Sequence, residues 1–306
     1  MTLDVVAEEY AEHRSHLIAV AYRLTGSVAD AEDAVQEAWL RLSSLDGAAR
    51  AEIREPRAWL TTVVGRICLD ALKSARARRE RYVGSWLPEP VVTPLSGRPA
   101  EDPLEQVVRD DGVRMAAMVV LDRLPPEQRV AFVLHDAFGI PYAEIADTLG
   151  CSEPAARQYA SRGRRTVADA EPPPRAALDE QRDVLERLLA AFAAGDTDGV
   201  VALLHPDAVL VGDSDGKART TAREMVGAEK IVRFLAGLYE RYNAGAVAQA
   251  RVVRVNGELG VAMPEVPGVG GEWTLSRRIT AFVLRDGRIA AIYDIVNPDK
   301  LTHVRF

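Results

Sequence analysis

The stretch PYAEIADTLGCSEPAARQYASRGRRTV, residues 141–167, carries the clearest fold signal in this sequence. Pro141 stands where a first-turn proline belongs, Gly150 can close the helix that follows, and Ser152 can cap the next one. On this second helix the small residues fall on one side: Ala156, Ala160, Gly163 and Val167. Two helices joined by a short, glycine-marked turn are typical of a helix-turn-helix.

The outer face of the second helix carries side chains that can read DNA bases. Arginine and glutamine make bidentate contacts to guanine and adenine edges in the major groove. The alternative is a helical hairpin with a solvated basic face, but cap, turn, small inner face and basic outer face together favour DNA binding. The expected DNA-binding residues here are Ser152, Arg157, Gln158, Ser161, Arg162 and Arg165.

Composition limits the class of protein. The 306 residues suggest two or three domains, and 48% hydrophobic with 27% charged residues is the balance of an ordinary folded protein. No apolar run approaches the roughly 18 residues that a membrane span needs, so we expect a cytoplasmic protein with no membrane partner. The two cysteines, Cys68 and Cys151, are far apart. We expect both to be reduced and buried, and we expect no metal and no cofactor.

The formal net charge of −7 hides a pattern of local charge. Residues 66–81 and 152–165 each hold an excess of arginine and lysine, whereas residues 30–37 hold four acidic residues and no basic one. Binding to nucleic acid draws mainly on phosphate neutralisation by basic side chains. The chain therefore has two basic helices and one acidic helix, which implies partners of opposite sign.

The acidic segment predicts a helix that begins after Ser27 in a capping-box-like start. Its acidic residues Asp30, Asp33 and Glu37 recur along one side, and the opposite side is apolar. A purely solvated face usually alternates its charges. From the residues alone, a solvated face and a docking face for a basic partner both remain open.

A further helix is expected from Pro56 onward, with Trp59 and Leu60 as its anchors and basic residues in its C-terminal half. Part of that basicity is explained by the helix dipole, which favours positive charge near the C-terminus. The aromatic and threonine residues between the basic ones still suit the binding of an unstacked DNA strand.

Proline-rich segments divide the chain. Residues 1–80 are helical in pattern, a proline-rich stretch follows, and helical patterning runs again from about residue 105 to 170. After Pro172-Pro173-Pro174, two helical patterns (185–192 and 231–242) mix with strand-like runs at 208–211, 250–255, 278–284 and 289–295. The last third therefore reads as an α+β domain.

Four motifs, taken in order, resemble the extracytoplasmic-function (ECF) RNA polymerase sigma factors. They are AYRLTGS (21–27), DAEDAVQE (30–37), AWLT (58–61) and LPPEQR (124–129), within a resemblance that covers residues 1–168. The resemblance implies that the acidic helix docks the clamp helices of RNA polymerase through Asp30, Asp33, Gln36, Glu37 and Leu40. It also implies that the helix from Pro56 opens and reads the minus-ten element through Trp59, Thr62, Arg66, Asp70, Lys73 and Arg76. The helix-turn-helix would then read the minus-thirty-five element.

Two shorter segments, WLPEP (86–90) and NPDKL (297–301), look like signatures of the sigma-J type, a group fused to a SnoaL-like domain. The implied fold is multidomain: two all-α sigma domains, a region 2 helical bundle and a region 4 helix-turn-helix, followed by an α+β SnoaL-like (NTF2-like) cone. The expected limits are 1–84 for region 2, 85–108 for a proline-rich linker, 109–170 for region 4, 171–177 for a second linker and 178–306 for the SnoaL-like domain with its tail.

The fused group suggests that the last domain is a built-in regulator, because a tethered domain acts at high effective concentration. Its Asp-Gly-Gly-Gly-Lys loop corresponds here to residues 213–217, with two glycines replaced; aspartate tolerates left-handed backbone angles better than most residues. The expected regulatory contacts are Trp86, Leu87, Pro88, Asp213, Gly216, Lys217, Asn297, Pro298, Asp299, Lys300 and Leu301.

Two other functions compete with a self-regulated sigma factor: a ligand-sensing DNA-binding regulator, and a SnoaL-like isomerase or cyclase fused to a helical adaptor. Fold kinship does not transfer chemistry. An isomerase needs a carboxylate base that faces a hydrogen-bond donor across an apolar pocket. Candidates for these roles exist at His205, Asp207, Asp213, Tyr242 and Asp294, but sequence positions alone cannot show whether they converge. We therefore expect no enzyme and no catalytic residue. The expected partners of a monomer are core RNA polymerase and promoter DNA, with a small ligand of unknown identity in the last domain left open.

Overall fold

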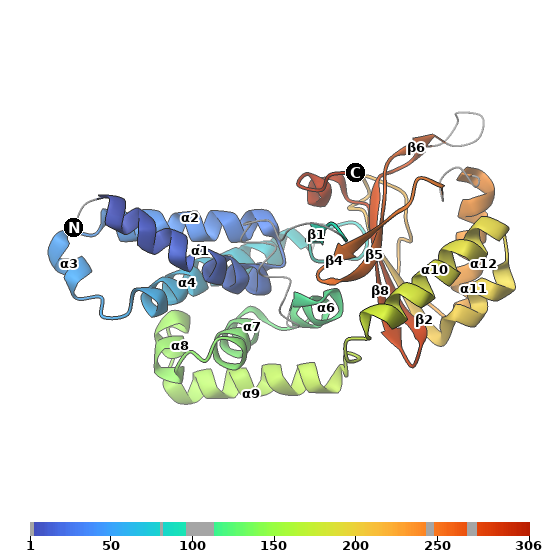
Figure 1. Cartoon of the computed structure of the whole chain (residues 1–306). Helices are drawn as coiled ribbons and strands as arrows, with labels where there is room; N and C mark the ends of the chain where they lie inside the picture. Colours follow the sequence, from blue (N-terminus) through green and yellow to red (C-terminus); the bar gives the residue numbers. More distant parts are fainter. Residues whose placement is uncertain (1–2, 80–81, 96–112, 243–247, 268–273) are drawn as a thin grey trace. The chain divides into compact units, whose positions relative to one another are not determined.

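The computed structural model describes residues 3–79, 82–95, 113–242, 248–267 and 274–306 (Figure 1). The chain divides into two compact units. The first holds residues 1–80, 99–113 and 117–172, and the second holds residues 81–98, 114–116 and 173–306. Residues 82–93, which span the end of the predicted region 2 (1–84) and the start of the predicted linker (85–108), therefore belong to the second unit.

The first unit is built of helices, as the sequence predicts. They are α1 (Leu3–Thr25), α2 (Val28–Ser44), α3 (Gly47–Ala51), α4 (Pro56–Arg79), most of α6 (Met115–Asp122), α7 (Pro126–Phe132), the π-helical turn η2 (Val133–Ala137), α8 (Tyr142–Leu149) and α9 (Glu153–Asp169). Helix α2 begins where predicted, because the Ser27 hydroxyl accepts a hydrogen bond from the Asp30 amide at 3.1 Å. Helix α4 begins at the predicted Pro56.

The helix-turn-helix is confirmed by its caps and by its packing. Helix α8 ends at Gly150, whose φ of 64° is the left-handed angle that glycine adopts most readily, and Ser152 caps α9 by accepting from the Ala155 amide. Helix α9 packs closely on α7, since a Cβ on Gly163 would lie 2.9 Å from the Phe132 Cβ. Small residues on this face are therefore needed for the two helices to meet.

Arg129, the last residue of the LPPEQR motif, is buried within this unit. Its Nε and Nη2 atoms donate to the Arg23 carbonyl at 3.1 and 3.0 Å, and Nη1 donates to the Asp122 carboxylate at 3.1 Å. A buried guanidinium needs such partners to offset its desolvation. Arg129 thus ties α7 to the end of α1.

The second unit is an α+β fold, as predicted. Its helices are α10 (Leu178–Ala194), α11 (Thr197–Leu203) and α12 (Ala228–Tyr242), and its tail holds the 3-10 turn η4 (Pro298–Leu301). The main sheet has the order β1-β4-β5-β8-β9-β2-β3, with β2 and β9 parallel and the other pairs antiparallel. The strands are β1 (Val92–Thr93), β2 (Leu204–Asp213), β3 (Met225–Val226), β4 (Arg251–Val255), β5 (Glu258–Met263), β8 (Arg278–Arg285) and β9 (Arg288–Ile295), and β6 (Val266–Pro267) pairs with β7 (Thr274–Leu275) as a separate ribbon.

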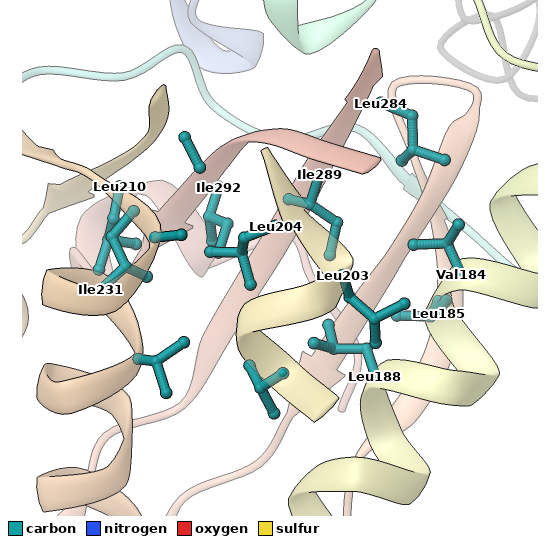
Figure 2. Packing of buried hydrophobic residues seen from close by; sticks show 14 of the residues in the cluster. Val184, Leu185, Leu188, Leu203, Leu204, Leu210, Ile231, Leu284, Ile289 and Ile292 are labelled. Atoms are coloured by element: carbon teal, nitrogen blue, oxygen red, sulfur yellow. The ribbon is translucent and has the colours of Figure 1, made fainter. Parts of the chain in front are cut away.

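The core of this unit lies between the helices and the sheet. Leu185 and Leu188 of α10, Ile231 of α12, Leu204 of β2 and Ile292 of β9, all labelled in Figure 2, belong to one cluster of buried residues. Burial of a large aliphatic side chain stabilises a fold by about 1.5–3 kcal/mol. The periodic apolar positions of α10 and of the strands therefore account for the packing.

The structure also bears on the expected burial of the two cysteines and on the search for membrane spans. Cys68 is buried as expected, but Cys151, in the turn between α8 and α9, is only partly buried. Within the described part of the chain, no helix is both long and apolar enough to cross a bilayer.

Candidate functional sites

The acidic face lies on the exposed side of α2. Asp33, Gln36 and Leu40 are exposed, whereas Asp30 and Glu37 are partly exposed. Leu40 is 54% exposed and lies on the same helix as these polar side chains. Glu37 forms an ion pair with Arg41 at 3.0 Å. An exposed leucine flanked by carboxylates is suited to contact a partner that offers both an apolar spot and basic side chains.

The predicted minus-ten residues lie along α4. Trp59 and Thr62 are partly buried, and Arg66, Asp70 and Lys73 are exposed. The side chain of Arg76 lies outside the described residues.

Two of the basic residues on α4 contact the helices of region 4. Arg66 donates to the backbone carbonyl of Asp147 in α8 at 3.0 Å, and Lys73 pairs with Glu127 of α7 at 3.5 Å. Gly65 lies against Leu134, since a Cβ added there would sit 3.2 Å from that side chain. A DNA strand that binds Arg66 or Lys73 therefore has to displace their contacts with Asp147 and Glu127.

His16, which the sequence analysis did not single out, joins α1 to α4. Arg57 donates to its Nδ1 at 2.9 Å, and its Nε2 lies 3.0 Å from the Thr61 hydroxyl. Desolvation by burial, followed by the nearby charge of Arg57, lowers the pKa of His16 to about 4. The ring is therefore neutral at pH 7, which fits its role as an acceptor from a guanidinium.

Helix α9, the second helix of the helix-turn-helix, presents its predicted DNA-binding residues outward. Arg157, Gln158, Ser161, Arg162 and Arg165 are all exposed, and Ser152 stands at the cap. Arg157 pairs with Glu153 at 2.5 Å, and its guanidinium lies 4.9 Å from the centroid of the Tyr142 ring. These contacts hold one end of the basic face in place without burying it.

A densely hydrogen-bonded site, only part of which was predicted from the sequence, joins residues 82–91 to the C-terminal domain. We call it the clasp; it consists of Tyr82, Trp86, Leu87, Val91, Asp213, Asn256, Asn297 and Lys300. At its centre the fully buried carboxylate of Asp213 accepts from the Leu87 amide at 2.6 Å, from Lys300 Nζ at 2.7 Å and from the Tyr82 hydroxyl.

The tail completes the clasp from the other side. Lys300 Nζ also donates to the Leu87 carbonyl and lies 3.9 Å from the centroid of the Trp86 ring, a cation–π distance. Asn297 donates to the Tyr82 hydroxyl oxygen at 2.8 Å. Burial, together with the Asp213 carboxylate, raises the pKa of Tyr82, so this hydroxyl stays protonated and donates.

A second group of contacts holds the next part of the linker and was missed from the sequence. Asn256, buried with a φ of 52°, accepts from the Val91 amide through its side chain at 3.0 Å and donates from its backbone to the Val91 carbonyl at 2.8 Å. Strand β1 then pairs with β4, with Val92 opposite Val255. An Asn-Gly pair between strand-like runs signals a hairpin turn, but it does not show what the turn binds.

The same turn contacts the chain on both sides of region 4. Glu258 lies 3.8 Å from Arg114, just before α6, and the Gly257 carbonyl accepts from Arg175, beyond α9. Arg114 also donates to the Pro173 carbonyl at 3.1 Å.

The remaining predicted regulatory residues lie next to the clasp. Asp215, in the loop at 213–217, adopts a φ of 50°, as expected of an aspartate that replaces glycine there, and Gly216 follows at 68°. Lys217 bridges Asp215 and Asp299 at 3.0 and 2.5 Å on the surface. Pro88 and Leu301 are buried, and the Pro298 carbonyl accepts from Arg277 at 3.4 Å.

The candidate catalytic bases take separate positions. The His205 ring accepts from the Asp207 amide at 3.2 Å, which is a capped turn, and Asp213 is used by the clasp. Asp294 pairs with Arg278 at 3.2 Å, and the Tyr242 side chain lies outside the described residues. Among the residues that the structure describes, no group of three histidine, cysteine or acidic side chains could hold a metal ion.

Comparison with known proteins assigns three segments of the chain to families. Residues 10–78 match Sigma-70 region 2, residues 114–167 match Sigma-70 region 4, and residues 185–292 match a SnoaL-like domain. The ECF RNA polymerase sigma factor SigJ of Mycobacterium tuberculosis is 54% identical over 300 residues, which cover 96% of this chain and 92% of that protein. This chain belongs to the ECF RNA polymerase sigma factors.

Further relatives agree with this assignment. The crystal structure of the same SigJ matches with a TM-score of 0.81 at 52% identity, over 97% of this chain and 98% of that one. The probable ECF sigma factor SigI of M. tuberculosis is 35% identical over 74% of this chain and 75% of its own length. This sigma factor therefore binds core RNA polymerase and promoter DNA to initiate transcription, and it is not an enzyme; nothing favours the two alternative functions.

Proposed function

We propose that three helical surfaces divide the work of this sigma factor. The exposed face of α2, with Asp30, Asp33, Gln36, Glu37 and Leu40, binds the clamp helices of core polymerase. Helix α4 opens and reads the minus-ten element, and the outer face of α9 reads the minus-thirty-five element. The exposure and charge of the α2 and α9 faces support their assignment, and the exposed Arg66, Asp70 and Lys73 support that of α4. We further propose that the protein acts as a monomer in the cytoplasm, where core polymerase is found.

We also propose that the C-terminal domain modulates this activity in cis by holding the linker. The observation that carries the proposal is the buried carboxylate of Asp213, which binds both the linker at Leu87 and the tail at Lys300. Such a buried, charge-assisted network is costly to leave half satisfied, so it favours one arrangement of the linker. The clasp keeps residues 82–93 in the C-terminal domain, so this part of the linker cannot also span between regions 2 and 4.

Two truncations of different length distinguish a clasp that inhibits transcription from a domain that is needed for transcription. A chain that ends at Val296 loses the tail side of the clasp, so we expect its transcription to rise. A chain that ends at Arg175 loses the whole domain and every contact that supports an active arrangement, so we expect its transcription to fall. Run-off transcription on a known promoter with saturating core polymerase measures both.

A chain that ends at Val304 is the matched control, because it keeps Asn297, Lys300 and also His303, which contacts the Pro90 carbonyl of the linker, and it should transcribe like the full-length protein. Equal activity of the full-length chain and of the Val296 and Arg175 truncations would show that the domain is no regulator.

Replacing Arg157 or Arg162 with alanine should weaken promoter binding. The salt dependence of the affinity should show whether the lost contact was to a base or to a phosphate. An arginine that reads a base costs about 1–3 kcal/mol when removed and relaxes specificity at one position. An arginine that contacts phosphate weakens binding to all sequences alike and lowers the salt slope. Affinities for promoter and random DNA at several salt concentrations distinguish the two. Arg182→Ala, an exposed arginine of α10, is the control, and wild-type binding by both variants would remove α9 from the recognition role.

A further inference from the structure

The C-terminal domain contains a cavity of about 160 Å³ between α10, α12 and the sheet. Its lining is apolar except for Arg278, Thr280 and Asp294. Figure 2 shows four of the apolar lining residues, Leu188, Leu204, Leu210 and Ile292. A cavity of about 150 Å³ lined by aliphatic and aromatic side chains holds one benzene molecule, so this one has the size of a single ring.

The three polar lining residues form one hydrogen-bonded group. Arg278 and Asp294 are only 8% and 6% exposed, and Arg278 donates to the Asp294 carboxylate at 3.2 Å. The hydroxyl of Thr280 donates to the same carboxylate at 3.4 Å, and Thr220 donates to it at 2.5 Å. The group has no net charge, but it offers both donors and acceptors.

These features select one ligand chemistry. A carboxylate would be attracted by Arg278 but repelled by Asp294, and an ammonium group would meet the reverse. Neither regains the free energy lost when a charge leaves water for an apolar site. A hydroxyl group can donate to Asp294 and accept from Arg278, and an apolar ring fills the remaining space.

The polar end of the cavity adjoins the clasp through the parallel pairing of β2 and β9. Asp294 stands opposite Gly212, and the next pair is Asp213 and Ile295. Gly212 lies against Thr220, because a Cβ there would collide with the threonine side chain that donates to Asp294. The Asp213 carbonyl also accepts from the Val296 and Asn297 amides at 2.9 and 3.0 Å. A ligand that hydrogen-bonds to Asp294 therefore restrains the paired ends of β2 and β9, where Asp213 of the clasp also lies.

We propose that this cavity binds a neutral small molecule with one ring-sized apolar body and one hydroxyl group, and that its occupancy stabilises the clasp. The second half of the proposal rests on the proposed function of the clasp. The first half does not.

Binding is tested with a matched series of single-ring probes on the full-length protein: phenol, toluene, benzoate and benzylamine. Saturable chemical shift changes in the protein's methyl NMR spectrum report binding. A purely apolar cavity prefers toluene, because a buried unpaired hydroxyl is costly. We expect phenol to bind about tenfold or more tightly than toluene, since its hydroxyl bonds to an ionised pair, and we expect benzoate and benzylamine to bind at least tenfold more weakly than phenol.

Ala250→Phe, which fills the cavity, should abolish phenol binding; Leu235→Trp serves if the first variant does not fold. No saturable phenol binding, or a preference for toluene or for a charged probe, would overturn the ligand assignment. Because the assay contains no polymerase or promoter, such a failure leaves the proposed sigma-factor regulation untouched.

The coupling is tested by amide hydrogen exchange of residues 82–93 with and without saturating phenol. The Leu87 and Val91 amides donate to Asp213 and Asn256, so their exchange reports opening of the clasp. We expect exchange in this segment to slow by at least threefold in the wild type and to be unchanged in the filled variant. Saturable binding with unchanged exchange would reject the coupling, whereas the truncation results decide separately whether the clasp regulates transcription.

Discussion

Replacing both Asp33 and Glu37 with lysine is expected to abolish binding to core RNA polymerase while leaving the fold intact. Asp33 is exposed and Glu37 partly so, and their helix has its own cap and a buried opposite face. The two changes convert an attractive contact with basic clamp helices into like-charge repulsion, which costs several kcal/mol, or about a hundredfold or more in affinity. Stability should change by no more than about 0.5 kcal/mol per site, because surface charges contribute little.

Co-purification with core polymerase and a thermal melt of the free protein measure these two effects. The matched control is Asp183→Lys with Glu186→Lys, the same charge change on exposed positions of α10. Retention of the Asp33 and Glu37 variant by core polymerase at wild-type strength would remove α2 from the docking role.

Asp213→Asn is expected to have the largest effect on stability. The substitution leaves Lys300 buried without its charged partner, and breaking a buried ion pair from one side costs about 3–5 kcal/mol. The free energy of unfolding of the C-terminal domain should fall by that amount, and residues 82–93 should exchange their amide hydrogens faster. Urea unfolding and hydrogen exchange measure the two changes.

The exposed ion pair beside the clasp supplies the control. Asp299 is exposed and pairs with Lys217 on the surface, so Asp299→Asn should cost less than about 1 kcal/mol. A second variant, Asp213→Asn with Lys300→Met, removes both charges and should recover much of the lost stability. Equal stability of Asp213→Asn and Asp299→Asn would contradict the central place of the Asp213 carboxylate.

Local patterns made much of this fold predictable. The caps at Ser27, Gly150 and Ser152 act within a few residues of where they stand, and the strand-like runs at 208–211, 250–255, 278–284 and 289–295 all lie in or overlap strands. Strand β5 was missed because nearly all of it is buried, so its residues do not alternate between apolar and polar.

The candidate sites were less predictable, for a physical reason. The two segments WLPEP and NPDKL were recognised by resemblance, but their partners Tyr82 and Asn256 were not. Tyr82 meets Asp213 across 131 positions of the chain, and Val91 meets Asn256 across 165. Periodicity and turn signals describe neighbours in sequence, so they cannot indicate which distant side chain satisfies a buried carboxylate or amide. The burial of Arg129 against Arg23 was missed for the same reason.

The claim that the clasp governs transcription is tested most directly by run-off transcription with saturating core polymerase on one promoter. The comparison is between the full-length protein and the Asp213→Asn, Lys300→Met variant, which weakens the clasp without leaving a buried unpaired charge. Hydrogen exchange of residues 82–93 confirms that the linker is released. The account predicts more transcript from the variant than from the wild type. The same amount of transcript from both, with the linker released in the variant, would contradict it.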